Sequence, residues 1–323
     1  MPLSRRNLLL GAAAPLVLPT SPSAAAAGQK VLRYAFEIAE TSLDPARISD
    51  IYSRTITPHI FEGLYCYDHL ARPVKFKPLT ADGMPQVSAD FRVWTVKVRP
   101  GIYFADDPAF SGKRRELVAQ DYVYSFKRFA DPANKSPAWN GMENDRYLGL
   151  TELREAALKS RKPFDYDHEI EGVRALDRYT VQFSLKDPRP RFIEVLAGGD
   201  LYGAVAREVV EFYGDKVDEH PVGTGPFKLV QWRRSSFIAL ERNPDFRAMF
   251  YDAEPTADDV EGQALLARLK GRRLALGIVG GRLGVVEHLA EVGVALERDE
   301  RAAPPLRELE GPVPTGCSST LSA

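Results

Sequence analysis

Two different hydrophobic periods occur in the central part of the chain, and together they exclude a fold made only of helices or only of strands. One segment has apolar side chains at every second position, the spacing of a half-buried strand: Tyr179, Val181, Phe183 and Leu185. An earlier segment has them at the spacing of one helix face: Tyr122, Val123, Phe126 and Phe129. Because strands and helices do not alternate strictly, we predict a mixed α/β or α+β body rather than a simple doubly wound sheet.

Shorter patterns predict further elements around these two. Four more segments are strand-like, and the last two form a predicted hairpin: residues 31–36, 91–98, 227–232 and 237–241. A helix is expected from about Asp50, with Gly63 at its end. Residues 132–163 are mostly polar, and we interpret them as a long insertion of helix and loop that is moderately exposed.

The composition argues against several classes of function. The net charge of -1 gives no global reason to expect nucleic acid or an anionic membrane as a partner. The two cysteines and five histidines show no metal-ligand spacing, so we predict no metal and no cofactor. The chain has no Gly-x-Ser-x-Gly motif, and the carboxylates of Asp106 and Asp107 fit a solvated turn better than a catalytic pair, so we predict no enzyme. The Gly-Thr-Gly sequence at 223–225 lacks the Lys-Ser/Thr of a phosphate loop.

The N-terminal segment, residues 1–27, has the three parts of an export signal. Arg5 and Arg6 stand directly before a short apolar run, residues 8–18, which is too short to span a bilayer comfortably. Four alanines follow and offer the small residues that signal peptidase requires. The pattern resembles a twin-arginine signal peptide cleaved near Ala27, with an ordinary secretory signal as the alternative. The cleavage region has no cysteine, so we expect no lipid anchor.

Five sequence blocks, in order and well spaced between about residues 31 and 250, carry a family resemblance. They are Leu-Asp-Pro at 43–45, Phe-Glu-Gly-Leu at 61–64, residues 94–104, residues 121–128, and the glycine-rich residues 221–227 followed by Glu-Arg-Asn-Pro-Asp-Phe at 241–246. Each block alone is common, whereas all five together are specific. The chain thereby resembles the large extracellular solute-binding proteins of ABC importers, in the oligopeptide- and dipeptide-binding group known as family 5.

The resemblance implies a fold and a function. The implied fold is a periplasmic binding protein type II-like first lobe with a mixed sheet over residues 28–270, with the second lobe largely missing. The implied function is that of a substrate-binding component, which captures peptides or similar small polar solutes in the periplasm for the inner-membrane permease of an ABC importer. The resemblance also implies a monomer with no nucleic acid partner. The alternative is a truncated, non-functional remnant of such a protein.

The resemblance places ligand contacts at two positions in the sequence. In peptide binders of this group, residues just after the Leu-Asp-Pro turn touch the ligand, and here these are Ser49, Asp50 and Ile51. A second contact is an aromatic residue after a Ser-Pro pair, and here the aromatic residue, Trp139, comes one position late. Both sets have a structural alternative, because Ser49 or Asp50 can cap a helix and Trp139 can pack in the core. Val118 stands where relatives usually have a capping threonine, so we expect a helix start weaker by about 1 kcal/mol.

The sequence changes character after about residue 270. Up to Leu274 it still resembles the family, but from Ala275 onward it contains no aromatic residue, lysine, asparagine, glutamine or methionine, although the whole chain is 10% aromatic. We predict that residues 271–323 form an atypical tail, either read out of frame from GC-rich coding DNA or disordered. The alternative is a natural helix over 285–298 with a disordered Pro-rich end. First-lobe strands that the returning chain completes in relatives are expected to lack partners.

Overall fold

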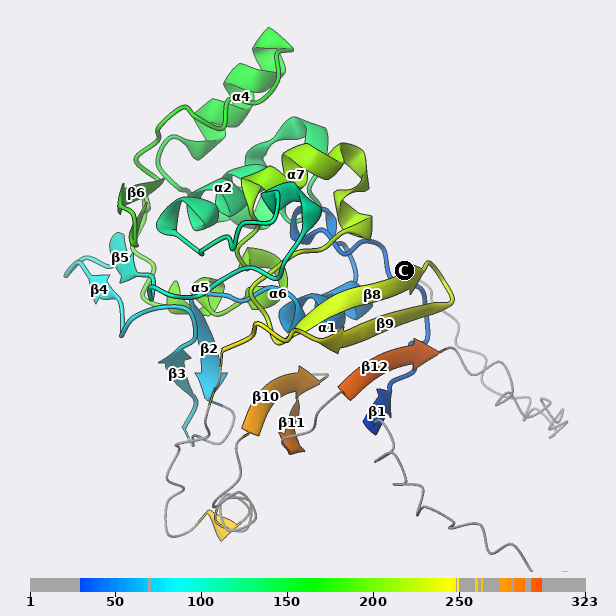
Figure 1. The fold of residues 1–323 in the computed structure, drawn as a ribbon. Helices are drawn as coiled ribbons and strands as arrows, with labels where there is room; N and C mark the ends of the chain where they lie inside the picture. Colours follow the sequence, from blue (N-terminus) through cyan, green and yellow to red (C-terminus); the bar gives the residue numbers. More distant parts are fainter. Residues whose placement is uncertain are drawn as a thin grey trace, which may run out of the picture.

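The computed structural model describes residues 30–68, 71, 73–247, 249, 259–260, 263, 274–279, 282–287 and 292–297. The predicted signal segment and its cleavage site lie outside these residues. Within these residues helices and strands occur in mixed order, as predicted, and the strands gather in two four-stranded sheets and two small hairpins (Figure 1). Within the described part of the chain, no helix has both the length and the apolar character to cross a membrane.

The first four-stranded sheet is antiparallel and has the order β4-β5-β7-β6. Its strands are β4 (Gln86–Val87), β5 (Val93–Lys97), β6 (Val173–Asp177) and β7 (Thr180–Ser184). The strands predicted over 91–98 and 179–185 are thus confirmed with shorter ends. Phe91 has a φ of 57°, in the left-handed region, so the extended strand begins only after it. Val96 of β5 and Val181 of β7 are directly paired on these neighbouring strands, and both side chains are fully buried.

Helix α2 (Ala119–Ala130) packs against this sheet and carries the predicted helical stripe. The four residues of that stripe are each at most 2% exposed: Tyr122, Val123, Phe126 and Phe129. Val118 offers no side-chain acceptor to the first turn, but the Asp121 carboxylate accepts the Val118 N–H at 2.8 Å. Half of a capping box is therefore present, and the helix start is less bare than the valine alone predicts.

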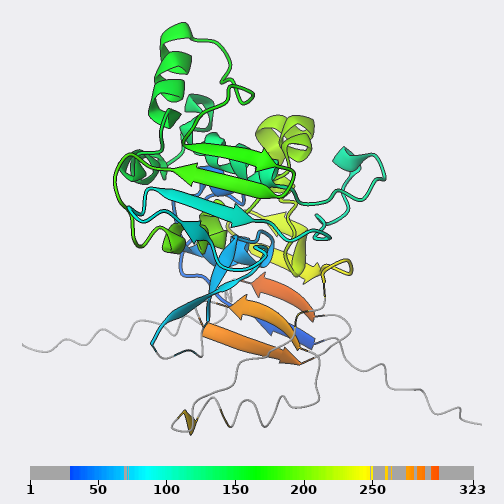
Figure 2. The same ribbon diagram turned by 90° about the vertical axis from the view of Figure 1, so that its left-hand side faces the viewer.

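The second four-stranded sheet is mixed and has the order β1-β12-β9-β8. Its strands are β1 (Lys30–Arg33), β8 (Phe227–Arg233), β9 (Phe237–Arg242) and β12 (Val292–Glu297). β1 runs parallel to β12, whereas β9 is antiparallel to both of its neighbours. The predicted hairpin is confirmed as β8 and β9, and the strand predicted over 31–36 ends early, at Arg33. Figure 2 shows this sheet below the first one.

Three strands occur within residues 271–323, the segment expected to be an atypical tail. β10 (Leu274–Val279) and β11 (Arg282–Glu287) form a hairpin, and β12 inserts between β1 and β9. The alternative of a helix over 285–298 is wrong, because strands occupy most of that range, and the valine-rich sequence of β12 favours extended backbone. Contrary to expectation, β1 and β9 have a partner strand in β12.

The insertion 132–163 contains η4 (Pro132–Asn134), α3 (Trp139–Asp145) and α4 (Leu150–Ser160), so the prediction of helix and loop is confirmed. Its exposure is uneven. The inner side chains belong to the main hydrophobic core: Trp139, Met142, Tyr147, Leu150 and Leu153. The outer face of α4 meets solvent, where Leu158 is 54% exposed. The insertion is therefore partly a structural component of the core.

Helix α1 (Ile51–Ile56) begins where the sequence predicts and ends before the predicted Gly63. Pro58 cannot donate the next helical hydrogen bond, so the chain continues in the 3-10 turn η2 (Thr57–His59). Gly63 serves close packing instead, since a Cβ there would stand 3.0 Å from the Leu196 carbonyl oxygen. α1 and the β8–β9 hairpin share a second, smaller core: Leu43, Ile56, Ile60, Phe61, Val205, Phe227, Ile238 and Leu240.

Shorter elements connect these parts. They are η1 (Pro45–Arg47), β2 (Tyr65–Asp68), β3 (Lys75–Pro78), η3 (Pro108–Phe110), α5 (Ile193–Leu196), α6 (Gly199–Tyr202), α7 (Arg207–Tyr213) and η5 (Gly214–Glu219). β2 and β3 form a two-stranded antiparallel sheet. α7 packs on both η3 and η5, which brings residues from two parts of the sequence to one side of β8.

Candidate functional site

A buried ion pair joins the Leu-Asp-Pro turn to helix α2. The Arg128 guanidinium donates to both oxygens of the Asp44 carboxylate, at 2.6 and 2.7 Å, and both side chains are 1% exposed. Burial is the largest single influence on Asp44 and acts to raise its pKa, but the charge and hydrogen bonds of Arg128, together with the Ala46 N–H and the Arg47 charge, outweigh it and lower the pKa of the carboxyl. Two sequence blocks that lie far apart in the chain are therefore joined inside the protein.

A second buried network joins the Phe-Glu-Gly-Leu block to the glycine-rich segment. The Glu62 carboxylate accepts hydrogen bonds from the Arg247 guanidinium at 2.7 and 2.8 Å and from the Thr224 hydroxyl at 2.9 Å. A Cβ on Gly223 would lie 2.0 Å from the Ile60 carbonyl oxygen. The glycine at this position thus allows the backbone to pass directly over the 60–62 segment.

The segment predicted to contact ligand starts helix α1. The Asp50 carboxylate accepts the Ser53 N–H at 2.7 Å and the Thr41 N–H at 2.9 Å, and it also binds the Thr41 hydroxyl. Burial raises the pKa of Asp50, but the hydrogen bonds from Ser53 and Thr41 outweigh it, and the net shift is downward. Asp50 is therefore the N-cap of α1, the structural role that the sequence left open for it. Ser49 is exposed and Ile51 is 65% exposed, so these two present the open surface of the segment.

Trp139 lies away from that surface. Its side chain is 8% exposed and belongs to the main core, whereas α1 packs on the smaller core. The Arg154 guanidinium stands 4.8 Å from the centroid of the ring. These contacts favour the packing interpretation that the sequence left open, and they do not bring Trp139 together with Ser49 and Ile51. Its contact with ligand stays a prediction.

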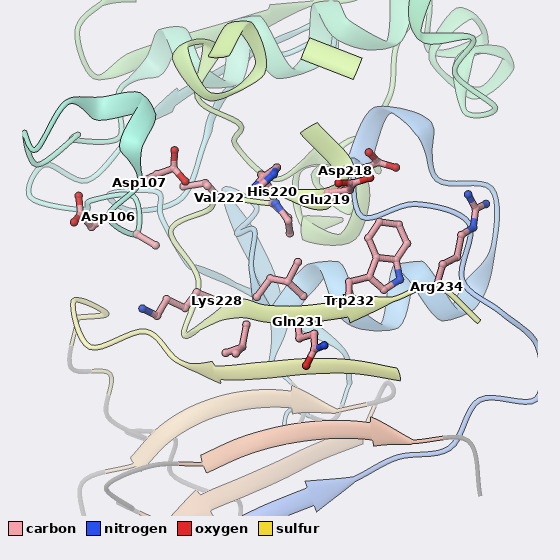
Figure 3. Close-up of a pocket in the computed structure, with 14 residues that line it drawn as sticks. Asp106, Asp107, Asp218, Glu219, His220, Val222, Lys228, Gln231, Trp232 and Arg234 are labelled. Carbon is pink, nitrogen blue, oxygen red and sulfur yellow. The ribbon is translucent and has the colours of Figure 1, made fainter. Parts of the chain in front are cut away.

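A polar groove of about 730 Å³ runs along β8 (Figure 3). Its floor is the segment from Lys228 to Trp232, with Arg234 beyond. The opposite wall is built from residues 105–107 and 218–222. The Ala105 N–H donates to the Gly223 carbonyl at 2.9 Å and so ties the two parts of the wall together. Sequence reasoning missed this groove, although the Asp106–Asp107 pair and the hairpin were each visible in the sequence.

The wall of the groove carries carboxylates with different surroundings. The Asp107 carboxylate accepts the Ala109 N–H at 2.9 Å and the Tyr213 hydroxyl at 3.1 Å. The Tyr213 ring in turn stacks on His220, with ring centroids 3.9 Å apart. Burial is the main reason why the pKa of Asp218 is raised. Asp107 is thus held by uncharged hydrogen-bond donors, and Arg47 is a cation that acts on Asp218.

Metal and thiol chemistry have little support in the described residues. No group of three or more His, Cys, Asp or Glu side chains within them is arranged to hold a metal ion. Cys66 is buried, and burial raises the pKa of its thiol to about 11, which leaves it protonated and unreactive at neutral pH. Cys317 lies outside the described residues.

Comparisons with known proteins agree with this scaffold. The family model described as "Bacterial extracellular solute-binding proteins, family 5 Middle" matches residues 75–265. The "Periplasmic oligopeptide-binding protein OppA" of Salmonella typhimurium is 30% identical over 207 residues, covering 64% of this chain and 34% of that protein. The "Di/tripeptide-binding protein 2" of Pseudomonas aeruginosa is 30% identical over 243 residues, covering 72% of this chain and 41% of that protein.

A solved structure confirms the fold. The periplasmic binding protein DppA from Helicobacter pylori, in complex with the peptide STSA, aligns with a TM-score of 0.53 and 26% identity, over 76% of this chain and 46% of that one. The chain spans about a third to two fifths of the length of the two curated relatives it matches. The chain belongs to the bacterial extracellular solute-binding proteins, family 5.

Proposed function

We propose that this chain supplies the first lobe of the substrate-binding component of an ABC importer, which captures peptides or similar small polar solutes. The observation that carries the proposal is the family match over residues 75–265, together with the two buried networks that hold its blocks in place. The relatives are named as peptide-binding proteins, which supports a binding role and gives no reason to expect an enzyme.

The proposed ligand contacts are Ser49 and Ile51 at the start of α1. Both are exposed, while Asp50 between them fixes the backbone through its hydrogen bonds to Thr41 and Ser53. A rigid backbone with open flanking side chains suits recognition, because less ordering is needed when a ligand binds. Trp139 is proposed as a contact only through the family resemblance, since it is largely buried.

We further propose where the protein acts and how it is exported. The relatives are periplasmic, which supports action outside the inner membrane. We propose export through the twin-arginine signal of residues 1–27, with cleavage near Ala27. We also propose that the protein acts as a monomer and delivers its ligand to an importer permease. Replacement of Arg5 and Arg6 by lysine tests the route: the precursor should then stay in the cytoplasm, and unchanged export would favour the ordinary secretory route.

A thermal-shift screen of the purified chain against a library of peptides and amino acids tests the binding role. A bound ligand stabilises the folded state, and about 100-fold excess over Kd gives roughly 2.7 kcal/mol. The Ile51→Ser variant should lose the shift, while the Leu158→Ser variant on α4, where the side chain is also more than half exposed, should keep it. No shift with any compound, together with aggregation, would instead support the alternative of a non-functional remnant.

The tail after residue 270 differs in composition from the rest of the chain. We propose that residues from about 275 onward are read out of frame, because their composition departs so abruptly from that of the preceding chain. Resequencing the gene is the test. A one-base change near that position should restore a sequence that continues the family pattern, and the absence of any such frame would end the proposal.

A further inference from the structure

The groove along β8 has features that the proposed function does not use. Among the strands that the structure describes, β8 is the last of its sheet, with β9 on one side and the groove on the other (Figure 3). A strand at the end of a sheet presents backbone N–H and C=O groups that an incoming extended chain can pair with. At Val230 the pairing of β8 with β9 shifts by one residue, and this side chain is 57% exposed.

The charges around the groove are unevenly matched. On the floor, Lys228 forms an ion pair with Glu241 at 2.9 Å, and Arg234 donates to the Thr41 carbonyl at 3.2 Å. Both basic groups line the groove, and each binds a partner outside its lining, while the Arg47 charge acts on Asp218. The wall carries four carboxylates, two near each end of the groove in Figure 3: Asp106, Asp107, Asp218 and Glu219.

We propose that this groove binds an extended, positively charged peptide segment, which adds as a further strand to the free edge of β8. The main chain of the peptide pairs with the strand, and its lysine or arginine side chains meet the carboxylates of the wall. Peptide addition to a sheet edge gains affinity from main-chain hydrogen bonds and specificity from alternate side chains. Opposite charges supply the remaining selectivity.

The dimensions of the groove suit such a ligand. Its volume of about 730 Å³ lies within the usual range for ligand pockets. The floor from Lys228 to Trp232 is as long as a five-residue strand, roughly 16 Å at 3.3 Å per residue. The half-buried Trp232 indole N–H is bound by the Glu40 carboxylate, so its ring is held at one end of the groove as an aromatic surface for a cation.

This site differs from the Ser49 and Ile51 surface of the proposed function and extends beyond it. The two are connected structurally, because Arg234 and Trp232 bind the 40–41 segment, and Thr41 binds the Asp50 carboxylate. An occupant of the groove would therefore approach the start of α1 without using the same side chains. The two proposals can fail separately.

Isothermal titration of the purified full chain with two capped pentapeptides tests the proposal. Acetyl-Lys-Val-Lys-Val-Lys-amide should bind, and its affinity should fall as salt is added, whereas acetyl-Glu-Val-Glu-Val-Glu-amide should not bind. A lysine peptide N-methylated along one edge should also fail, because methylation removes the hydrogen bonds that pair it with β8. Equal binding of the acidic or the methylated peptide would overturn the proposal.

A matched pair of double variants locates the site. Asp218→Asn with Glu219→Gln should raise the Kd for the lysine peptide about tenfold, because two of the four carboxylates of the wall lose their charge. Glu152→Gln with Glu155→Gln removes the same charge from the exposed face of α4 and should leave the Kd within about twofold. Equal effects of the two double variants would mean that only net charge matters. A library shift that survives the groove variant, but not Ile51→Ser, would leave the proposed function intact while this site fails.

Discussion

The charges in two regions of this protein have opposite surroundings. Asp44 and Arg128 are each 1% exposed and bind each other through two hydrogen bonds, whereas Lys228 and Glu241 beside the groove are 40% and 50% exposed. The buried pair joins two of the sequence blocks shared with the family, whereas most of the groove lining, including its four carboxylates, lies outside those blocks. Recognisable motifs here hold the scaffold together, and the surfaces open to a ligand have to be found from the structure.

Loss of the buried arginine should have the largest effect on stability. Arg128→Met leaves the Asp44 carboxylate buried without its partner, and such a loss typically lowers the free energy of unfolding by about 3–5 kcal/mol. The matched exposed change is Lys159→Met on α4, where Lys159 pairs with Glu155 and the side chains are 78% and 55% exposed. That variant should change stability by about 0.5 kcal/mol or less.

Urea unfolding of each purified variant measures the change in its free energy of unfolding. Adding Asp44→Asn to Arg128→Met should restore part of the loss, because the buried negative charge is then removed. Similar losses for Arg128→Met and Lys159→Met would show that burial does not separate the two kinds of charge, and the comparison between the regions would fail.

Acid should weaken the small core through His59. This imidazole is 8% exposed, its ring meets Phe227 edge-on with centroids 5.8 Å apart, and burial lowers its pKa from 6.5 to about 4. Between these values the unfolded chain binds a proton and the folded chain does not, so stability is lost as pH falls from 6.5 to 4. The loss amounts to about 3 kcal/mol. His59→Leu removes this titration.

The pH profile of unfolding, recorded for the wild type and His59→Leu between pH 7 and 4.5, tests this effect. The wild-type profile should fall more steeply than that of the variant in this range. Parallel profiles for wild type and His59→Leu would contradict the predicted burial of a neutral histidine.

The close approach of two backbone segments at Gly223 gives the next smaller effect on stability. In Gly223→Ala the new Cβ would meet the Ile60 carbonyl oxygen at 2.0 Å, so the backbone must shift, at a cost of about 1–3 kcal/mol. Gly141 lies in helix α3 with nothing within 4 Å of its Cβ position, and alanine there should stabilise the protein by about 0.5–1 kcal/mol. Thermal unfolding should therefore move in opposite directions for the two alanine variants, and a shared direction would exclude the close-approach argument.

The fold was more predictable from sequence than the site, for a physical reason. Strands β5 and β7 and helix α2 carry local hydrophobic periods, and these can be read from a few neighbouring residues. The Pro58 break in the first helix was also a local signal, and it was overlooked in favour of Gly63. The pairing of Asp44 with Arg128 could not be read this way, because 84 positions separate the two residues.

The groove is even harder to predict from the sequence than this ion pair. Asp106 and Lys228 line the same cavity but belong to segments whose approach depends on the packing of α7, η3 and η5. Neither segment contains a residue pattern that predicts its approach to the other. The exposure of Trp139 was equally undetermined, since an aromatic residue in a polar insertion can face solvent or, as here, the core.

The smallest expected change is a gain in stability at the start of α2. Val118→Thr introduces a hydroxyl that can accept the Asp121 N–H, while the Asp121 carboxylate already accepts the Val118 N–H at 2.8 Å. The full capping box should raise the free energy of unfolding by about 0.5–1 kcal/mol, measured by urea unfolding. Val118→Ala is the control, because it also removes methyl groups of the valine and adds no acceptor. If threonine stabilises no more than alanine does, the half box seen here already satisfies the helix start, and the divergence from the family's capping threonine has no energetic consequence.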